Sequence, residues 1–456
     1  MAILTTKGIK IFKTCNLYLC FLMLGMSVAI PGPTLLDLEN LVGTDMQHIA
    51  FIYTARSSGY LFGSLAGGVL FDMVARKQVI LTLVNFVASL SMLGIPWSRS
   101  IGVLTALMTI NGMMLGCMDT GGNVCCLNLW GKDSGPFYQA LHFTFGLGAL
   151  IAPLIAAPFV GNFDTSDFSF ENSSIVAANT TLQPGFRNYL NDSLIENFEI
   201  PPITYAYSAI GIFSLFVTAL FLIICIIAPL ETQGPQSEKS QVRERKLSFI
   251  LLIVFLNIIL VFVEIGTEVG YAQMLTTYVV KGPLKLSPTT GSYMTSGFWA
   301  AFSVSRFLSV FLAIKFSNLQ MIVFDIIVTS IGALVLLTSG GSQVWAIWLA
   351  TILFGVGTAS FFPAAVGWVE KYVTVTNKMA SSFCVGAAFG EMIIPFIIST
   401  YIDTVPRVLL YTVAASCVLS AAVVFLMWLI LRKINKDKYV KDEGTANAAY
   451  DANVNA

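Results

Sequence analysis

Charged residues are scarce in this sequence. Asp, Glu, Lys and Arg make up 11% of the 456 residues, and apolar or aromatic residues make up 56%, whereas a typical soluble domain is roughly 25% charged. Charge-free runs such as 14–36, 78–98, 203–230 and 408–431 reach the roughly 20 residues that a helix needs to cross a bilayer. This composition excludes an ordinary soluble fold and predicts membrane-spanning helices.

Other patterns are missing as well. The apolar runs lack the strict alternation over about ten residues that is typical of barrel strands, so the lipid bilayer is expected to hold helices. No block of basic residues indicates a nucleic-acid partner, and no metal-ligand cluster, nucleotide loop or nucleophile arrangement stands out. All eight cysteines lie in apolar runs, so disulfides are not expected. We therefore expect neither an enzyme nor a bound cofactor.

Apolar runs separated by breaks predict an all-α protein of twelve spans in two six-helix halves. The first half is expected over 1–230, a cytoplasmic linker over 231–246, the second half over 247–432 and a cytoplasmic tail over 433–456. The spans themselves are predicted near 14–38, 48–71, 78–98, 101–129, 135–160, 203–230, 247–280, 288–314, 318–339, 342–369, 379–402 and 407–431.

The orientation follows from the positive charges between the spans. With both termini in the cytoplasm, eighteen Lys and Arg residues fall inside and five outside, as the positive-inside rule requires. The chain's Asn-x-Ser/Thr signals, at Asn172, Asn179 and Asn191, all fall in the long polar loop 161–202, which is extracellular in the same orientation. Charge and glycosylation signals thus agree, and together they indicate a glycoprotein of the secretory pathway.

The loop between the second and third spans carries a recognisable motif. It has Gly68, Asp72 four residues later, and the basic pair Arg76 and Lys77 at a tight turn. This spacing resembles the loop signature of the major facilitator superfamily, although Met73 and Ala75 replace an expected basic residue and an expected glycine. The resemblance implies that Gly68, Asp72 and Arg76 help to close the cytoplasmic gate.

Two further stretches narrow the resemblance. Residues 115–123, LGCMDTGGN, and residues 265–269, IGTEV, resemble stretches of the fucose/proton symporter branch, and Phe361-Phe-Pro363 is similar to that branch too. The whole chain most resembles the animal sodium-dependent glucose transporter group. This resemblance implies a sugar as solute and sodium as the coupling ion. The proton-coupled members carry an aspartate in the first span, which is absent here until Asp37.

Ionisable residues inside spans are costly, so each predicts a function or a specific partner. Asp119 and Asn123 share one face of their helix, where they can bind sugar hydroxyls or instead hydrogen-bond a neighbouring helix. Gln139 is a candidate solute contact. Its neighbour His142 is a weaker candidate, since a lone histidine in a membrane more often packs than relays protons.

The seventh span carries two carboxylates, Glu264 and Glu268, one helical turn apart. Two buried carboxylates cannot both stay ionised without a cation or a water-filled cavity, so this pair, together with Asp119, is a candidate ion-coupling site. Glu268 and the nearby Gln273 are also candidate solute contacts. The carboxylates alone fit a proton as well as sodium.

Opposite charges occur on spans that would face each other across the halves. Arg56 in the second span and Glu391 in the eleventh are candidates for a gating salt bridge, whereas Arg306 is interpreted as an anchor at the cytoplasmic side. Asp325 in the ninth span has no assigned role. Trp299, Phe362 and Trp368 could offer an apolar face to a sugar ring or simply pack.

Together these features predict a sodium-coupled sugar symporter working by alternating access in the plasma membrane, with the apical membrane as one option. An uncoupled facilitator and a proton-coupled carrier of another small polar solute stay open. A membrane receptor or scaffold without transport, using the tail after Lys433, is the alternative of another class.

Overall fold

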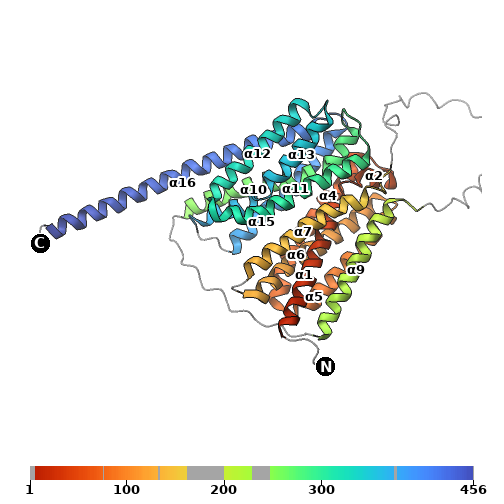
Figure 1. The fold of residues 1–456 in the computed structure, drawn as a ribbon, viewed down its shortest axis with the longest axis horizontal. Coiled ribbons are helices and arrows are strands. Elements are labelled where there is room, and N and C mark those ends of the chain that lie inside the picture. Colours follow the sequence, from red (N-terminus) through yellow and green to blue (C-terminus); the bar gives the residue numbers. More distant parts are fainter. Residues whose placement is uncertain are drawn as a thin grey trace, which may run out of the picture.

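A computed structural model describes residues 6–74, 76–131, 134–161, 200–227, 247–373 and 377–454. Within these ranges the chain is almost entirely helical (Figure 1). The predicted glycosylation sites Asn172, Asn179 and Asn191 lie outside the described residues, as does the linker 231–246. The side chain of Asp72 is likewise not described.

The helices follow one another with short connections. In the first half they are α1 (Thr6–Ala29), α2 (Leu35–Val42), α3 (Met46–Ile49), α4 (Phe51–Met73), α5 (Lys77–Gly94), the short 3-10 helix η1 (Ile95–Trp97), α6 (Ile101–Trp130), α7 (Ser134–Ala156) and α9 (Ile203–Ile227). In the second half they are α10 (Leu247–Lys281), α11 (Pro288–Lys315), α12 (Asn318–Ser339), α13 (Val344–Thr358), α14 (Phe361–Glu370), α15 (Asn377–Ile402) and α16 (Val408–Val454).

Eleven helical stretches of the described chain are long and apolar enough to cross a bilayer. They confirm a membrane protein with many spans. The predicted second span is the 23-residue helix α4, which is not among the eleven. Its glycine, serine, tyrosine and Arg56 residues lower its hydropathy below that of its neighbours, which explains the difference from the expected twelve.

Two predicted spans are interrupted. The run 14–38 is not one helix, because α1 ends at Ala29 and α2 begins at Leu35, with Pro31 and Pro33 in the turn between them. Proline lacks the backbone N–H that a helix interior needs. The run 342–369 is likewise divided into α13 and α14, with a break at Ala359 and Ser360.

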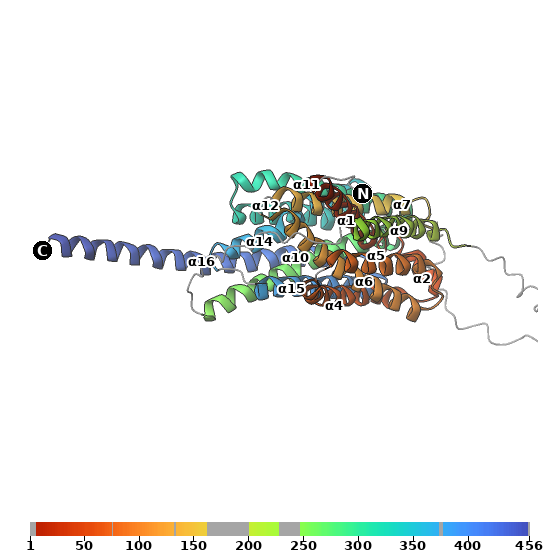
Figure 2. The same ribbon diagram turned by 90° about the horizontal axis from the view of Figure 1, so that it is seen from below.

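Helix packing repeats between the two halves. In the first half α1 packs on α7, α4 on α6, and α5 on α9; in the second half α10 packs on α15, α11 on α13, and α12 on α16. The halves meet mainly where α7 contacts α11 and where α4 contacts α15. Figures 1 and 2 show the resulting pair of helical bundles, coloured red to yellow-green and green to blue.

Glycines permit the closest of these contacts. A Cβ at Gly63 of α4 would overlap the backbone carbonyl of Met113 on α6, and a Cβ at Gly390 of α15 would overlap that of Phe262 on α10. Such small residues let membrane helices approach backbone to backbone. Gly68, by contrast, faces open space in this conformation, so the close contact of α4 lies earlier in the helix than the loop motif.

The connectivity defines two ends of the molecule. The α2 end holds α2, the last turn of α10 and the connection between α15 and α16; the tail end holds the first turn of α1, the start of α7 and the end of α11. Helix α16 begins at the α2 end and continues past the bundle at the other (Figure 1).

Candidate functional site

A small cavity lies between the two halves. Its volume is about 110 Å³, and its lining includes Arg56 and Tyr60 from α4, Glu268 from α10, Trp299 from α11 and Glu391 from α15. Helices of both halves therefore contribute polar groups to one enclosed space. Of the predicted site residues, Glu268, Arg56 and Glu391 are brought together here.

The C-terminal half supplies a carboxylate with an open position. Glu268 is 6% exposed, and its Oε2 has no hydrogen-bond partner in the described structure. The indole Nε1 of Trp299, 3% exposed, has no partner there either. Buried polar atoms are normally hydrogen-bonded, so an acceptor and a donor left open in one cavity are typical of a place that a ligand or ion completes.

The N-terminal half supplies a carboxylate that is already held. Tyr60 donates its hydroxyl to Oδ2 of Asp119 at 2.6 Å, and Nδ2 of Asn123 donates to Oδ1 at 3.2 Å. Asp119 and Asn123 lie on one face of α6 and hydrogen-bond to each other there, while their predicted contact with a solute stays a prediction. Tyr60 was not identified from the sequence, because it is 59 residues from Asp119 and meets it only through the packing of α4 on α6.

Arg56 does not donate to Glu391 in this conformation. Its Nη1 donates to the backbone carbonyl of Val28 at 2.9 Å, and its guanidinium carbon lies 5.8 Å from the centre of the Tyr53 ring. Arg56 and Glu391 nevertheless line the same cavity. Their predicted role in gating stays a prediction.

A second, larger hollow lies toward the tail end. Its volume is about 460 Å³, and its lining includes Tyr138, Gln139 and His142 from α7, Arg306 from α11 and Phe362 from α14. His142 packs edge-on against the Tyr138 ring, with 4.7 Å between the ring centres. Gln139 and His142 therefore face a space large enough for a small solute, since ligand pockets typically measure roughly 300–1,000 Å³.

Other predicted residues lie apart from both hollows. Glu264 is buried one turn before Glu268 but does not line the cavity. Gln273 is 3% exposed, and neither atom of its amide has a partner within the described chain. Arg76 is exposed and directly precedes α5 at the tail end.

The structure gives Asp325 a partner. The hydroxyl of Ser360 donates to Oδ2 of Asp325 at 2.6 Å. Ser360 stands at the break between α13 and α14. Asp325 therefore fixes an interrupted helix next to the larger hollow, which the sequence alone did not reveal.

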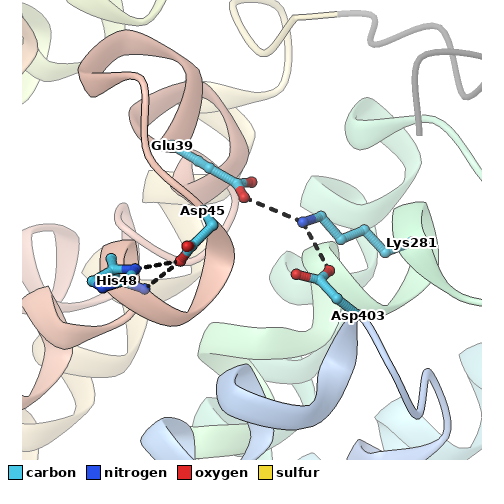
Figure 3. Close-up of polar contacts among 5 residues, drawn as sticks. All are labelled: Glu39, Asp45, His48, Lys281 and Asp403. Carbon is cyan, nitrogen blue, oxygen red and sulfur yellow. Dashed lines mark hydrogen bonds and ion pairs between the residues drawn. The ribbon is translucent and has the colours of Figure 1, made fainter. Parts of the chain in front are cut away.

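A cluster of charges joins the halves at the α2 end. Nζ of Lys281, at the end of α10, lies 3.3 Å from Oε1 of Glu39 on α2 and 3.0 Å from Oδ1 of Asp403 after α15 (Figure 3). The side chains of Lys281 and Glu39 are only 7% and 11% exposed, whereas that of Asp403 is 43% exposed. Of these two contacts, the one to Glu39 crosses between the halves.

Near this cluster, α3 begins with a cap. The backbone N–H and ring Nδ1 of His48 both contact Oδ1 of Asp45, at 2.8 and 2.7 Å (Figure 3). A capped helix start holds the connection from α2 to α4 in one geometry. Glu39 is thereby presented to Lys281 from a defined position.

This architecture is found in solved transporters. The chain matches a bacterial homologue of the human lysosomal transporter Spinster in an inward-facing, unoccupied conformation, with a TM-score of 0.65 and 11% identity over 95% of this chain and 99% of that one. It also matches the xylose transporter XylE from E. coli, with a TM-score of 0.62 and 12% identity over 92% and 98%. These likenesses show that the chain has the fold of these solved transporters.

Sequence relatives identify the family more closely. Proteins named sodium-dependent glucose transporter 1 are 31% identical in Xenopus laevis, over 87% of this chain and 77% of the relative, and 32% identical in Homo sapiens, over 86% and 74%. The relative of that name from Danio rerio is 34% identical, and the chain spans 63% of its length. No family model matches the chain. The chain belongs to the family of the sodium-dependent glucose transporter 1 proteins.

Proposed function

We propose that this protein carries a sugar together with sodium across the plasma membrane by alternating access. The observation that carries the proposal is the cavity between the halves, in which Glu268 presents a buried carboxylate oxygen without a partner. Buried carboxylates in membrane proteins typically belong to ion or substrate pathways. The names of the family's relatives support sodium as the ion and glucose as the solute.

In this proposal the N-terminal half binds the solute. Asp119, Asn123 and Gln139 offer acceptors and donors that suit sugar hydroxyls, and Tyr60 connects Asp119 to the cavity between the halves. A site built to hydrogen-bond hydroxyls rejects solutes that lack them, because its own polar groups would be left unpaired.

The two ends of the molecule support an alternating mechanism. Lys281 and Glu39 join the halves at the α2 end, while the larger hollow lies toward the tail end. The positive charges of the sequence place the tail end in the cytoplasm, so this conformation corresponds to one closed to the outside. Opening the α2 end requires Glu39 to part from Lys281.

Coupling then requires that sodium binds one set of conformations better than the other. A ligand shifts an equilibrium only by its difference in affinity between two states. A carboxylate contributed by one half and enclosed by the other meets this requirement, because movement of the halves changes its surroundings. Glu268 occupies such a position.

Uptake of a labelled glucose analogue into cells tests the proposal. Cells express the wild type or Asp119→Asn, and external sodium is replaced by choline at constant pH. We expect uptake to fall on sodium replacement, and to fall about 10-fold to 100-fold in Asp119→Asn if that carboxylate supplies the roughly 1.5–3 kcal/mol of a charged hydrogen bond.

Asp45→Asn is the matched control. It makes the same chemical change at an exposed helix cap, where asparagine caps as well as aspartate. Sugar uptake that is indifferent to sodium would contradict the coupling, and sensitivity to pH in its place would favour a proton. An absence of sugar uptake at normal surface expression would contradict the solute.

A further inference from the structure

The cavity between the halves contains more charge than a sugar site needs. Arg56, Glu268 and Glu391 all line it. Its volume of about 110 Å³ corresponds to about three or four water molecules at roughly 30 Å³ each. In this conformation the space therefore suits an ion with little water better than a sugar ring.

The charges of these three side chains do not balance. The charges of Arg306 and Glu264 also act on Glu268, so three carboxylates and two guanidiniums surround this space and leave at least one negative charge in excess when all are ionised. Within the described ranges no Lys, Arg or His nitrogen lies within 4.0 Å of the Glu268 or Glu391 carboxylate. An uncompensated charge out of water is costly, so this cavity, which both carboxylates line, favours binding of a monovalent cation.

One buried carboxylate oxygen of the cavity is open to such an ion. Oε2 of Glu268 has no partner although the residue is 6% exposed. Arg306, the other nearby arginine, lines the larger hollow toward the tail end. Its Nε donates to the backbone carbonyl of Ala359 at 3.1 Å. The open oxygen of Glu268 is thus free to ligate an ion.

The cation and the anions come from different halves. Arg56 is carried by α4 of the first half, whereas Glu268 and Glu391 are carried by α10 and α15, which pack against each other in the second half. A movement between the halves therefore leaves the two carboxylates together and changes their distance from Arg56.

We propose that Glu268 and Glu391 form the binding site of the coupling cation, and that Arg56 is an internal cation that competes with it. This inference rests on the proposed function and assigns the ion to a place. When the halves bring Arg56 toward the carboxylates, its guanidinium compensates them and the ion leaves. When Arg56 withdraws, the two carboxylates bind sodium.

The arrangement provides the difference in affinity that coupling requires. Sodium binds the conformation in which Arg56 is distant and is disfavoured in the one in which Arg56 is near. Arg56 is accordingly a positioning residue of the ion cycle and does not need to touch the solute.

Thermal unfolding of the purified full-length protein in detergent tests this site without any solute. Sodium chloride is exchanged for choline chloride at constant ionic strength and pH, and the unfolding temperature is recorded. A ligand that binds only the folded protein raises this temperature. We expect sodium to stabilise the wild type, and not to stabilise Glu268→Gln or Glu391→Gln.

Two further variants complete the design. Asp325→Asn is the matched control, because this buried carboxylate of the same half bonds to Ser360 and lies outside the cavity lining. It is expected to keep the sodium effect. Arg56→Gln removes the competitor, so its sodium effect should reach half its maximum at about tenfold lower sodium. If Arg56→Gln does not fold, the likewise uncharged Arg56→Met must show a shift in the same direction.

The outcomes separate the ion site from the sugar. Sodium stabilisation that the glutamate variants lose supports the site, even if sugar uptake fails and the proposed solute is wrong. Absence of sodium stabilisation in the wild type overturns the inference. It is also overturned if sodium stabilises the glutamate variants as much as the wild type, or if neither arginine variant shifts the sodium dependence. Stabilisation of the wild type by acid pH in place of sodium overturns it as well.

Discussion

Asp119 in the N-terminal half and Glu268 in the C-terminal half lie on helices that face the centre of the molecule, yet their surroundings differ. Both oxygens of Asp119 accept hydrogen bonds, from Tyr60 and Asn123, while Oε2 of Glu268 has no partner within the described structure. A carboxylate held at both oxygens is fixed in orientation before any ligand arrives, which suits recognition of a solute. A carboxylate with an unpartnered oxygen, such as Glu268, suits an ion that binds and dissociates in each transport cycle.

Glu39 at the α2 end shows a third arrangement. This carboxylate is buried and has a full positive charge beside it, from Lys281 of the other half. Burial nevertheless raises the pKa of Glu39, because desolvation outweighs the lowering by Lys281. The pair thus joins the halves, although the attraction of Lys281 does not compensate the desolvation of the Glu39 carboxylate. Such incomplete compensation is common for buried ion pairs.

The largest effect is expected from Lys281→Met, which leaves Glu39 buried without its cation. Breaking a buried pair by removing one partner costs roughly 3–5 kcal/mol, so the α2 end should open far more often. Thr277→Cys is a suitable probe, since Thr277 is fully buried on α10 four residues before Lys281 and its hydroxyl has no partner in the described part of the chain.

Modification of this cysteine by an external, membrane-impermeant thiol reagent should be at least about 100-fold faster in Lys281→Met, since each 1.4 kcal/mol corresponds to about tenfold. Lys285→Met, at an exposed position four residues later, is the control. Equal rates in both backgrounds would show that the charge cluster does not hold the α2 end closed.

Tyr60→Phe is expected to have an intermediate effect. It removes the donor to Oδ2 of Asp119 and makes this carboxylate resemble Glu268. A hydrogen bond to a charged group contributes about 1.5–3 kcal/mol, so half-maximal uptake should require about 10-fold to 100-fold more solute, with the sodium requirement unchanged. Uptake measured over a range of solute concentrations checks this.

Tyr278→Phe provides the comparison for Tyr60→Phe. The hydroxyl of Tyr278 donates to the backbone carbonyl of Gly340 at 3.2 Å, away from the cavity between the halves. This variant should leave the solute requirement near that of the wild type. If Tyr278→Phe raised the solute concentration for half-maximal uptake more than Tyr60→Phe, the assignment of Asp119 to the solute site would be wrong.

The smallest effect is expected from Glu39→Gln, together with a change in pH dependence. Because the pKa of Glu39 is raised where the residue is buried, the closed α2 end binds a proton more tightly than an open end with Glu39 in water. Lowering the pH from neutral toward the ordinary carboxylate range, about 4.3, should therefore favour the closed end and slow modification of Thr277→Cys.

In Glu39→Gln this effect of pH on the modification rate should disappear. The pH dependence of the thiol reaction itself should remain. At neutral pH the variant should differ from the wild type by less than about tenfold, since replacing a buried charge by a neutral isostere is often close to neutral. Faster modification in the wild type as the pH falls would reverse the sign and contradict this interpretation.

Much of the fold could be predicted because long charge-free runs indicate membrane-spanning helices. The misplaced boundaries have specific causes. The turn at Pro31 and Pro33 and the break at Ser360 lie inside apolar runs, so hydropathy continues through them. Helix α4 carries Arg56 and many small residues, so its hydropathy is low although it packs closely on α6.

The site was predictable only where its parts are local. Asp119 and Asn123 are one turn apart, and their hydrogen bond follows from helix geometry. Tyr60 and the pairing of Lys281 with Glu39 depend on which helices become neighbours, over separations of 59 and 242 residues. Lys281 could be counted from the sequence as a charge at the end of a span, but its partner could not be identified.

The most direct test of the account is accumulation of solute by the reconstituted wild-type protein. Proteoliposomes are given the same labelled glucose analogue on both sides, with sodium either higher outside or equal on both sides and the membrane potential clamped. Coupled transport predicts that the inward sodium gradient raises the internal solute above the external concentration, and that equal sodium does not. Solute that never exceeds the external concentration under the sodium gradient, despite measurable exchange, would contradict sodium-coupled symport.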